Sequence, residues 1–389
     1  MKKLVLFSLF LAAVVIILGA YTRLTDAGLG CPDWPGCYGN LTVPLSDAKV
    51  VAANTAFPER PVEVHKAWNE MIHRYFAGAL GLCILAIAII AFKQRHQGTP
   101  VKLPLLLLVL VIFQAALGMW TVTLNLLPVV VMGHLLGGFT VLSCLFLLYL
   151  RLRKHSKVMQ TNGLKTSEHE RAFAGQTASG FCGPNDTSET ASVSTYSSTT
   201  TGLSNSVSVS TLGKSSKLTR LAFVGIVILV GQIALGGWTS ANYAALACTD
   251  MPICEPGWQQ RLDFSGAYSV PEAENYEFGA HNYGERATMH IVHRFGAAIT
   301  FIYLTVLAFT WLRSSTLPPS VKKGCVLMLA VLCAQVALGL SNVLFSLPLF
   351  IAVSHNAVAA ILLLTLIWLT WSVIPSSSSF SYPTGGHHG

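Results

Sequence analysis

Charged residues are scarce in this sequence. Lysine, arginine, aspartate and glutamate together make up 11% of the 389 residues, whereas 52% are hydrophobic, and the mean hydropathy is +0.57. A soluble domain carries about 25% charged residues. The deficit excludes an ordinary soluble globular protein and indicates an integral membrane protein.

Two motifs of soluble proteins are also missing. No Cys-x-x-Cys spacing is present, and "GLG" at 28–30 is no dinucleotide fingerprint because no βαβ pattern surrounds it. The chain does have apolar runs of the ~20 residues that cross a bilayer as a helix. The eight runs are 4–21, 70–92, 103–124, 129–150, 218–238, 289–312, 324–344 and 349–374. They predict an all-α integral membrane protein with eight transmembrane helices.

The first run also resembles a signal peptide, because Met1, Lys2 and Lys3 precede an apolar stretch. However, the run 218–238 leads into the same motif from inside the chain, where a signal peptide does not belong. This favours a retained helix.

The net charge of +8 is distributed unevenly along the chain. If the N-terminus is inside, 17 of the 25 lysines and arginines fall on inner segments, as the positive-inside rule expects. This places both termini in the cytoplasm and the loops 22–69 and 239–288 outside. If the chain is bacterial, the membrane is the inner (plasma) membrane and the loops are periplasmic. Membrane lipid, and not nucleic acid, is therefore the predicted environment.

The segment 155–216 is rich in serine, threonine and glycine and has little apolar periodicity. It is predicted to be a disordered cytoplasmic linker. The predicted domains are a first four-helix half (1–154), this linker, a second four-helix half (217–375) and a short tail (376–389).

The two halves repeat one another. "LGAYTRLTDAGLGCPDWPGC" at 18–37 aligns without a gap with "LGGWTSANYAALACTDMPIC" at 235–254. "EMIHRY" at 70–75 corresponds to "HIVHRF" at 290–295, and Gln114 to His134 has the same length as Gln335 to His355. Since each half has four helices, the halves are predicted to be parallel repeats, each a four-helix bundle.

Four histidines occupy matched places within the apolar runs: His73, His134, His293 and His355. A single such histidine is usually a polar bridge between helices, but two matched pairs favour metal ligation. His73 is predicted about one turn into its helix, and His134 one to two turns into its own, on the same side. Two imidazoles at one level suit the two axial positions of a haem iron. Zinc is the weaker alternative, since it usually has four ligands.

Cysteines are paired in the outer loops. Cys31 and Cys37 are six residues apart, as are Cys248 and Cys254. In an oxidising compartment each pair is predicted to form a disulfide that closes its own loop, with metal ligation and free thiols as alternatives.

One carboxylate distinguishes the halves. Glu70 precedes His73 by three residues, so both lie on one helix face, and His290 holds the matched position. Glu70 is a candidate catalytic carboxylate. The alternative is a solvated residue that favours the helix dipole at the outer end. His290 is a rival ligand to His293, and Arg74 and Arg294 could bind haem propionates or anchor the helix start.

"YTRLTDAGLG" at 21–30, "EMIHRY", "GH" at 133–134, "HIVHRF" and "SH" at 354–355 together resemble the haem A synthase family. The resemblance covers all eight helices but not the linker. It implies that haem O is the substrate and haem A the product, that the C8 methyl group is oxidised to a formyl group, and that water supplies the oxygen.

The resemblance also implies residue roles. His73 and His134 would bind the substrate haem, Glu70 would be catalytic, and haem b would be held by His293 and His355 in the second half. Haem O synthase (protohaem farnesyltransferase) and assembly factors of the terminal oxidase would be partners, and an oligomer is compatible with the family.

Two other classes of function fit less well. A di-haem cytochrome b that passes electrons from quinol explains the four histidines but not the difference between Glu70 and His290. A transporter with parallel repeats does not explain four histidines at one depth.

Overall fold

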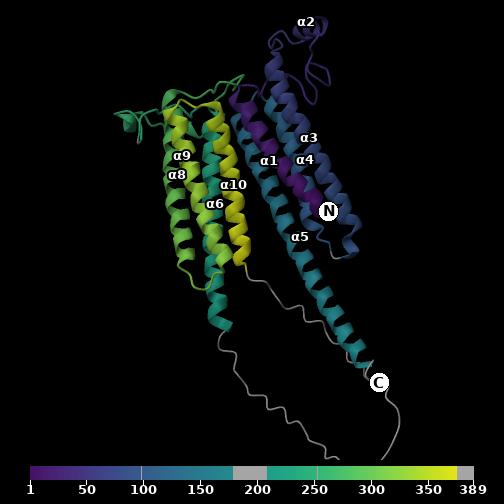
Figure 1. Ribbon diagram of the computed structural model, residues 1–389. Coiled ribbons are helices and arrows are strands. Elements are labelled where there is room, and N and C mark those ends of the chain that lie inside the picture. Colours follow the sequence, from purple (N-terminus) through teal and green to yellow (C-terminus); the bar gives the residue numbers. More distant parts are fainter. Residues whose placement is uncertain (98, 178–207, 252, 375–389) are drawn as a thin grey trace, which may run out of the picture.

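A computed structural model describes residues 1–97, 99–177, 208–251 and 253–374. Its regular structure in these ranges is entirely helical (Figure 1). The elements are α1 (Lys2–Leu24), α2 (Asp47–Ala56), α3 (Val64–Lys93), η1 (Arg95–Gln97), α4 (Lys102–Thr123), α5 (Pro128–Thr177), α6 (Ser208–Ala241), η2 (Trp258–Arg261), α7 (Phe264–Ala267), α8 (Tyr283–Leu312), α9 (Pro319–Leu344) and α10 (Leu349–Val373).

Eight of these helices are long and apolar enough to cross a membrane. They are α1, α3, α4, residues 128–154 of α5, residues 217–241 of α6, α8, α9 and α10. Each covers all or nearly all of one apolar run, so the predicted class and the eight spanning helices are confirmed.

The two helices that carry His73 and His293 begin earlier than the apolar runs predicted. α3 begins at Val64 and α8 at Tyr283, because polar residues continue the helix beyond the apolar stretch. Asn282 and Glu285 form a capping box that fixes the start of α8. His73 therefore lies nine residues after the start of α3, and its predicted place one turn into the helix is wrong.

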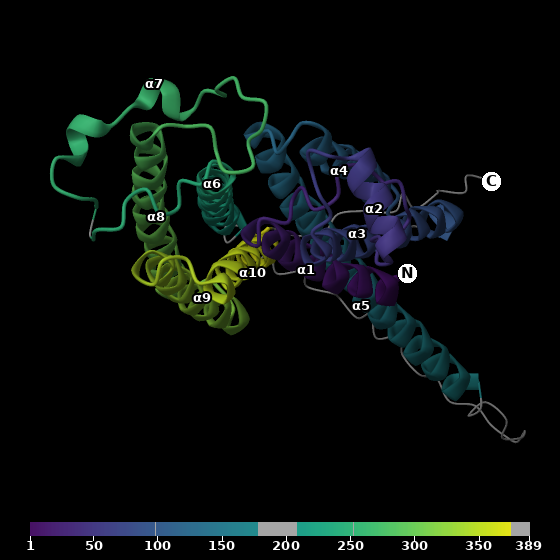
Figure 2. The same ribbon diagram turned by 90° about the horizontal axis from the view of Figure 1, so that it is seen from above.

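The spanning helices form two groups of four (Figure 2). In the first group, α1 packs on α3, α3 on α4, α4 on α5 and α5 on α1. In the second group, α6 packs on α8, α8 on α9, α9 on α10 and α10 on α6. Each group is thus a closed ring, in which α3 lies diagonally opposite α5 and α8 diagonally opposite α10.

The contact between the groups is reciprocal. α1, the first helix of the first group, packs on α10, the fourth helix of the second group. Likewise α6, the first helix of the second group, packs on α5, the fourth helix of the first group. A two-fold relation between the halves requires such reciprocity. The loops that follow α1 and α6 also lie at the same end of the molecule (Figure 1).

Matched residues meet across this contact. Arg23 donates a hydrogen bond to the backbone carbonyl of Ser240, 217 residues later, at 2.7 Å. The hydroxyl of Tyr243 donates to Asp26 at 2.7 Å, with the same separation of 217 residues. Arg23 also lies 4.0 Å from the centroid of the Tyr243 ring, a cation–π contact. Residues of the repeated opening motif therefore form hydrogen bonds between the two halves.

The main hydrophobic core runs through both groups at the end away from these loops. It includes Ile84 of α3, Leu107 of α4, Leu145 of α5 and Leu366 of α10, all fully buried. Since this end is filled by apolar side chains, the four histidines lie in the other half of the bundle, toward the loops.

The predicted linker overlaps two helices. α5 extends to Thr177 and α6 begins at Ser208, so helix enters the segment 155–216 from both sides. Its centre, 178–207, and the predicted tail 376–389 lie outside the described residues. The division into four domains and the parallel repeat stay predictions.

Candidate functional site

His73 and His134 face each other across the centre of the first group. They come from the diagonally placed helices α3 and α5, and their ring centroids are 6.3 Å apart with planes at 79°. Two imidazole nitrogens that bind one metal ion from opposite sides, each at about 2 Å, place the ring centroids about 6 Å apart. The spacing therefore suits one metal between the two rings.

His293 and His355 hold the same positions in the second group. They belong to α8 and α10, which are also diagonal. The structure thus brings together the two histidine pairs that the sequence predicted.

Each of these histidines packs against a glycine of the adjacent helix. A methyl group added to Gly19 of α1 would lie 2.9 Å from Cε1 of His73, and one on Gly236 of α6 would lie 2.9 Å from Cε1 of His293. The same distance is 3.2 Å from Gly118 to His134 and from Gly339 to His355. The four glycines therefore leave the space in which the imidazoles lie.

Three glutamines contact these histidines from adjacent helices. Nε2 of Gln114 donates to the backbone carbonyl of His134 at 2.8 Å. Nε2 of Gln232 donates to the carbonyl of His293 at 3.0 Å and lies 3.0 Å from its ring Nδ1. Nε2 of Gln335 lies 3.2 Å from ring Nε2 of His355.

Haem fits this arrangement. Nδ1 of His73, His134 and His355 is buried without a hydrogen-bond partner in the described part of the chain, and a buried imidazole nitrogen without a partner is unfavourable unless a ligand satisfies it. No group of three or more His, Cys, Asp or Glu that could hold a metal occurs among the described residues. The first centre thus has two imidazoles that face each other, and in the second His355 lies close enough to His293 to interact with it. A pair of histidines matches axial ligation of a haem iron better than a zinc site.

The packing of glycine on histidine leads to a measurable prediction. Gly236→Ala is expected to displace the His293 ring, at an overpacking cost of about 1–3 kcal/mol, and to lower the haem content of the second half. Gly231→Ala in the same helix is the matched control, because a methyl group there meets nothing within 4 Å. Absorbance of low-spin haem per protein measures the effect. Equal haem content in both variants would contradict the packing argument.

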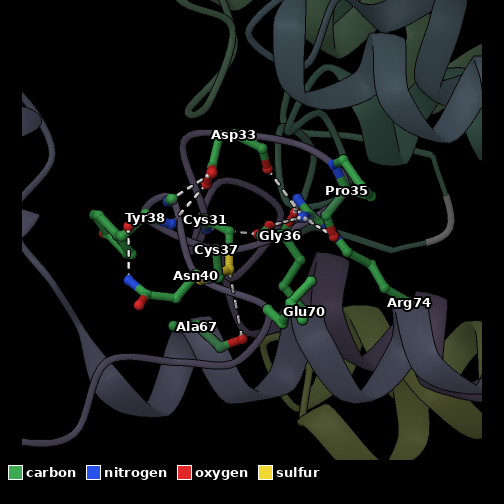
Figure 3. The surroundings of a disulfide bond; sticks show 12 residues. Cys31, Asp33, Pro35, Gly36, Cys37, Tyr38, Asn40, Ala67, Glu70 and Arg74 are labelled. Carbon is green, nitrogen blue, oxygen red and sulfur yellow. Dashed lines mark hydrogen bonds and ion pairs between the residues drawn. A yellow bond between two sulfur atoms is a disulfide. The ribbon is translucent and has the colours of Figure 1, made fainter.

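Glu70 is buried, with 4% of its surface exposed, so its interpretation as a solvated residue is wrong. Its carboxylate forms an ion pair with Arg74 and accepts a hydrogen bond from the backbone N–H of Cys31 at 2.8 Å. Arg74 in turn donates to the backbone carbonyls of Asp33 and Gly36. Figure 3 shows how these bonds hold the disulfide loop over the N-terminal part of α3.

Both predicted cysteine pairs are disulfide-bonded. Cys31 is joined to Cys37, and Cys248 to Cys254. In the first loop, the carboxylate of Asp33 accepts hydrogen bonds from the N–H groups of Tyr38 and Gly39 at 2.6 and 2.8 Å. Burial raises the pKa of the Tyr38 hydroxyl to about 12, so this side chain stays neutral beside the carboxylates.

In the second half the same contacts are made without a carboxylate. The backbone nitrogen of Cys248 lies 3.3 Å from Nδ1 of His290, and Nε of Arg294 lies 3.3 Å from Nε2 of the same ring. A neutral imidazole can accept only one of these two hydrogen bonds. Arg294 also donates to the carbonyls of Cys248 and Asp250. The His290 ring thus lies between the disulfide loop and Arg294, which favours His293 as the ligand. Arg74 and Arg294 both bind backbone carbonyls of the disulfide loops.

The sequence reasoning missed several residues around the histidines. It assigned no role to the four glycines or to Gln232, and it used Gln114 and Gln335 only to align the repeats. The repeated Leu-Gly pairs at 18–19, 117–118, 235–236 and 338–339 were the available signal, because a small residue at a matched helix position indicates close packing.

A family model described as "cytochrome oxidase assembly protein" matches residues 2–179 and 191–367 of the chain. The chain belongs to this family. Among curated members, a haem A synthase of Shewanella oneidensis is 43% identical over 376 residues, which cover 96% of this chain and 97% of the relative.

More distant relatives of this cytochrome oxidase assembly family also align over most of the chain. Haem A synthases of Caulobacter sp. (strain K31) and Chelativorans sp. (strain BNC1) are each 24% identical, over 94% and 90% of this chain and 94% and 84% of their own length. Together with the eight apolar helices, the family identifies a multi-pass membrane protein.

Proposed function

We propose that this protein is a haem A synthase, an oxidoreductase that converts the C8 methyl group of haem O to a formyl group. The observation that carries the proposal is the difference between two otherwise matched centres. Both have a pair of histidines on diagonal helices, but only the first has a buried carboxylate, Glu70, three residues before its histidine. The name haem A synthase, which the relative that is 43% identical carries, supports the same activity.

The substrate haem O binds in the first half, with His73 and His134 as axial ligands. These two residues would orient the macrocycle, because their rings face each other with centroids 6.3 Å apart. The apolar surroundings of the bundle suit its farnesyl tail.

Glu70 is the catalytic carboxylate in this proposal. It either accepts the proton lost as the methyl group is oxidised or stabilises positive charge at that carbon before water attacks. Both roles need the negative form, with which the Arg74 ion pair is compatible. Water adds its oxygen to the carbon as two electrons and two protons leave, giving the alcohol. A second oxidation of the same kind gives the hydrated aldehyde, which loses water to become the formyl group. The four electrons pass to an external electron acceptor.

His293 and His355 hold a resident haem b in the second half. When bound, haem b supplies a one-electron carrier that can relay electrons away from the substrate half. The glutamines and glycines around these histidines fix the ring positions and so determine the ligand geometry.

The membrane orientation follows from the charge distribution. The disulfide loops and both centres lie toward the outer side of a bacterial plasma membrane, and both termini are cytoplasmic. Haem O synthase, as the source of substrate, and assembly factors of the terminal oxidase are the partners that this activity needs.

Pigment analysis tests the proposed function. The protein is expressed in cells that make haem O but no haem A, and the non-covalent haems are extracted and separated. We expect haem A in these cells and none in cells with an empty vector. If only haem B and haem O are found, the protein is no haem A synthase, and a di-haem cytochrome becomes the better interpretation.

A further inference from the structure

Arg286 is a cation without a protein partner near the disulfide-loop end of the second group. It lies in the first turn of α8, and its side chain is half-buried. Within the described part of the chain its Nε is buried without a hydrogen-bond partner, and its guanidinium forms no ion pair. A buried polar nitrogen is normally hydrogen-bonded to protein, water or a ligand. The partner of Arg286 has therefore to be sought outside the described residues.

Arg286 lies on the face of α8 that points into the bundle. His293 follows it by seven residues, about two helical turns, and Leu304 follows it by 18 residues, or five turns. Leu304 is fully buried in the main hydrophobic core, and His293 packs on Gly236 of α6. Residues in register along a helix share its face. Arg286 is therefore in line with the His293 ring and about 10 Å nearer the loops, at 1.5 Å rise per residue.

The charge of Arg286 is not neutralised along its own helix. A carboxylate three or four residues away would lie beside it, but none occupies these positions. They hold Asn282, Tyr283, Met289 and His290. The carboxylate of the adjacent Glu285 is taken up by the His281 ring, at 2.8 Å, and by the N–H of Asn282, at 3.0 Å.

The first half has a cation at the matched position. Lys66 precedes His73 by seven residues, the same spacing as in the second half. Its ammonium, however, is paired with the carboxylate of Glu63 at 2.9 Å, and the second half has Tyr283 at the place of Glu63. Both centres thus have a cation two turns from a candidate ligand, and among the described residues only that of the second half lacks a carboxylate partner.

We propose that Arg286 binds a propionate of the haem in the second half. A haem carries two carboxylates at one edge, and burying them without a counter-charge is unfavourable. A guanidinium matches a carboxylate with two parallel hydrogen bonds. The neighbouring Arg294 already donates to backbone carbonyls of the disulfide loop. This inference rests on the proposed function, in which His293 and His355 hold haem b.

A lipid phosphate is the other anion that an arginine near the end of a spanning helix meets. Lipid surrounds the bundle, whereas Arg286 shares the inner face of α8 with the buried Leu304. The inner face favours the propionate. The experiment has to separate the two anions, so it varies the charge of the haem itself.

The test compares haem B with its dimethyl ester, in which both propionates are uncharged. The full-length parent protein carries His134→Ala, so that only the second half keeps both axial ligands, and it is purified haem-free from cells that cannot make haem. Each pigment is titrated into the protein in detergent, and the low-spin absorbance gives its Kd. Arg286→Gln, Arg286→Lys and Arg261→Gln are compared with this parent. Arg261→Gln is the matched control, because Arg261 is an exposed cation of the same half that pairs with Glu255.

We expect the parent to bind haem B about tenfold more tightly than the ester, since a hydrogen bond to a charged group contributes about that factor. Arg286→Gln should weaken haem B binding by a similar factor and leave ester binding unchanged. Arg286→Lys should keep part of the preference, because it has the charge without the planar fork. Arg261→Gln should behave as the parent does. The ester also reports folding, because it occupies the same centre without needing the cation.

Three results would overturn the inference. They are equal affinity of the parent for both pigments, as expected if Arg286 binds a lipid phosphate, a full preference for haem B in Arg286→Gln, and an equal loss of preference in Arg261→Gln. If Arg286→Gln binds neither pigment, Arg286→Lys decides: a reduced preference supports the inference and an unchanged one contradicts it. Failure of the proposed function looks different, because neither pigment would then give a low-spin spectrum with the parent.

Discussion

Glu70→Gln is expected to bind haem as well as the wild-type protein but to yield mainly haem O, with some trapped alcohol. Glutamine keeps the shape, and its amide oxygen can still accept the hydrogen bond from the N–H of Cys31. It removes the negative charge that the oxidation needs. Positioned acid–base groups typically contribute about 10²–10⁴-fold in rate, so haem A formation should fall by a factor in that range.

Extraction and chromatography of the haems from cells that make haem O measure this effect. His290→Gln is the matched control, because it alters the corresponding loop contact of the second half without removing a carboxylate. Its yield of haem A is expected to fall far less. If Glu70→Gln forms haem A at the wild-type level, the carboxylate only anchors the disulfide loop.

His293→Ala or His355→Ala is expected to remove the low-spin b-type spectrum of the second half. Either substitution takes away one of the two axial ligands, and loss of a supporting group alone costs 10–100-fold in metal affinity. We therefore expect haem B content to fall by more than about tenfold in the purified protein, as measured by the reduced-minus-oxidised spectrum and the extracted pigment.

His290→Ala separates ligation from general damage to α8. The ring of His290 lies between the backbone of Cys248 and the guanidinium of Arg294, so its loss should loosen the loop but leave the low-spin spectrum. A variant that lacks His293, His355 and the two histidines of the first half provides the decisive test. A full b-type spectrum from that protein would show that another residue holds the haem.

Properties that depend on local composition were predictable. The eight spanning helices follow from runs of apolar residues, since a backbone in lipid has to satisfy its own hydrogen bonds. The duplication follows from a fixed offset of 217 residues, and the cysteine pairs follow from the same six-residue spacing in both loops. The histidine pairs could be selected because ionisable groups are rare in such helices.

Helix limits and burial were harder to predict. The apolar run placed Glu70 at a helix start, where a carboxylate is usually solvated. α3 begins at Val64 instead, and the loop of Cys31 folds back over the carboxylate. That loop is held by Arg74, which lies 41 residues from the Asp33 carbonyl it binds. No local sequence pattern indicates a hydrogen bond between residues so far apart in the chain.

By itself, the sequence determined the all-helical membrane class, the repeat and the four candidate histidines, because hydrophobicity and spacing are local properties. The tertiary structure alone decided which helices lie diagonally, that Glu70 is buried against a disulfide loop, and that a glycine of an adjacent helix packs on each of the four histidines. The physical reason is that these features arise from side chains of different helices brought together by packing, and a glycine or glutamine in an apolar run acquires its role only from the side chain it meets.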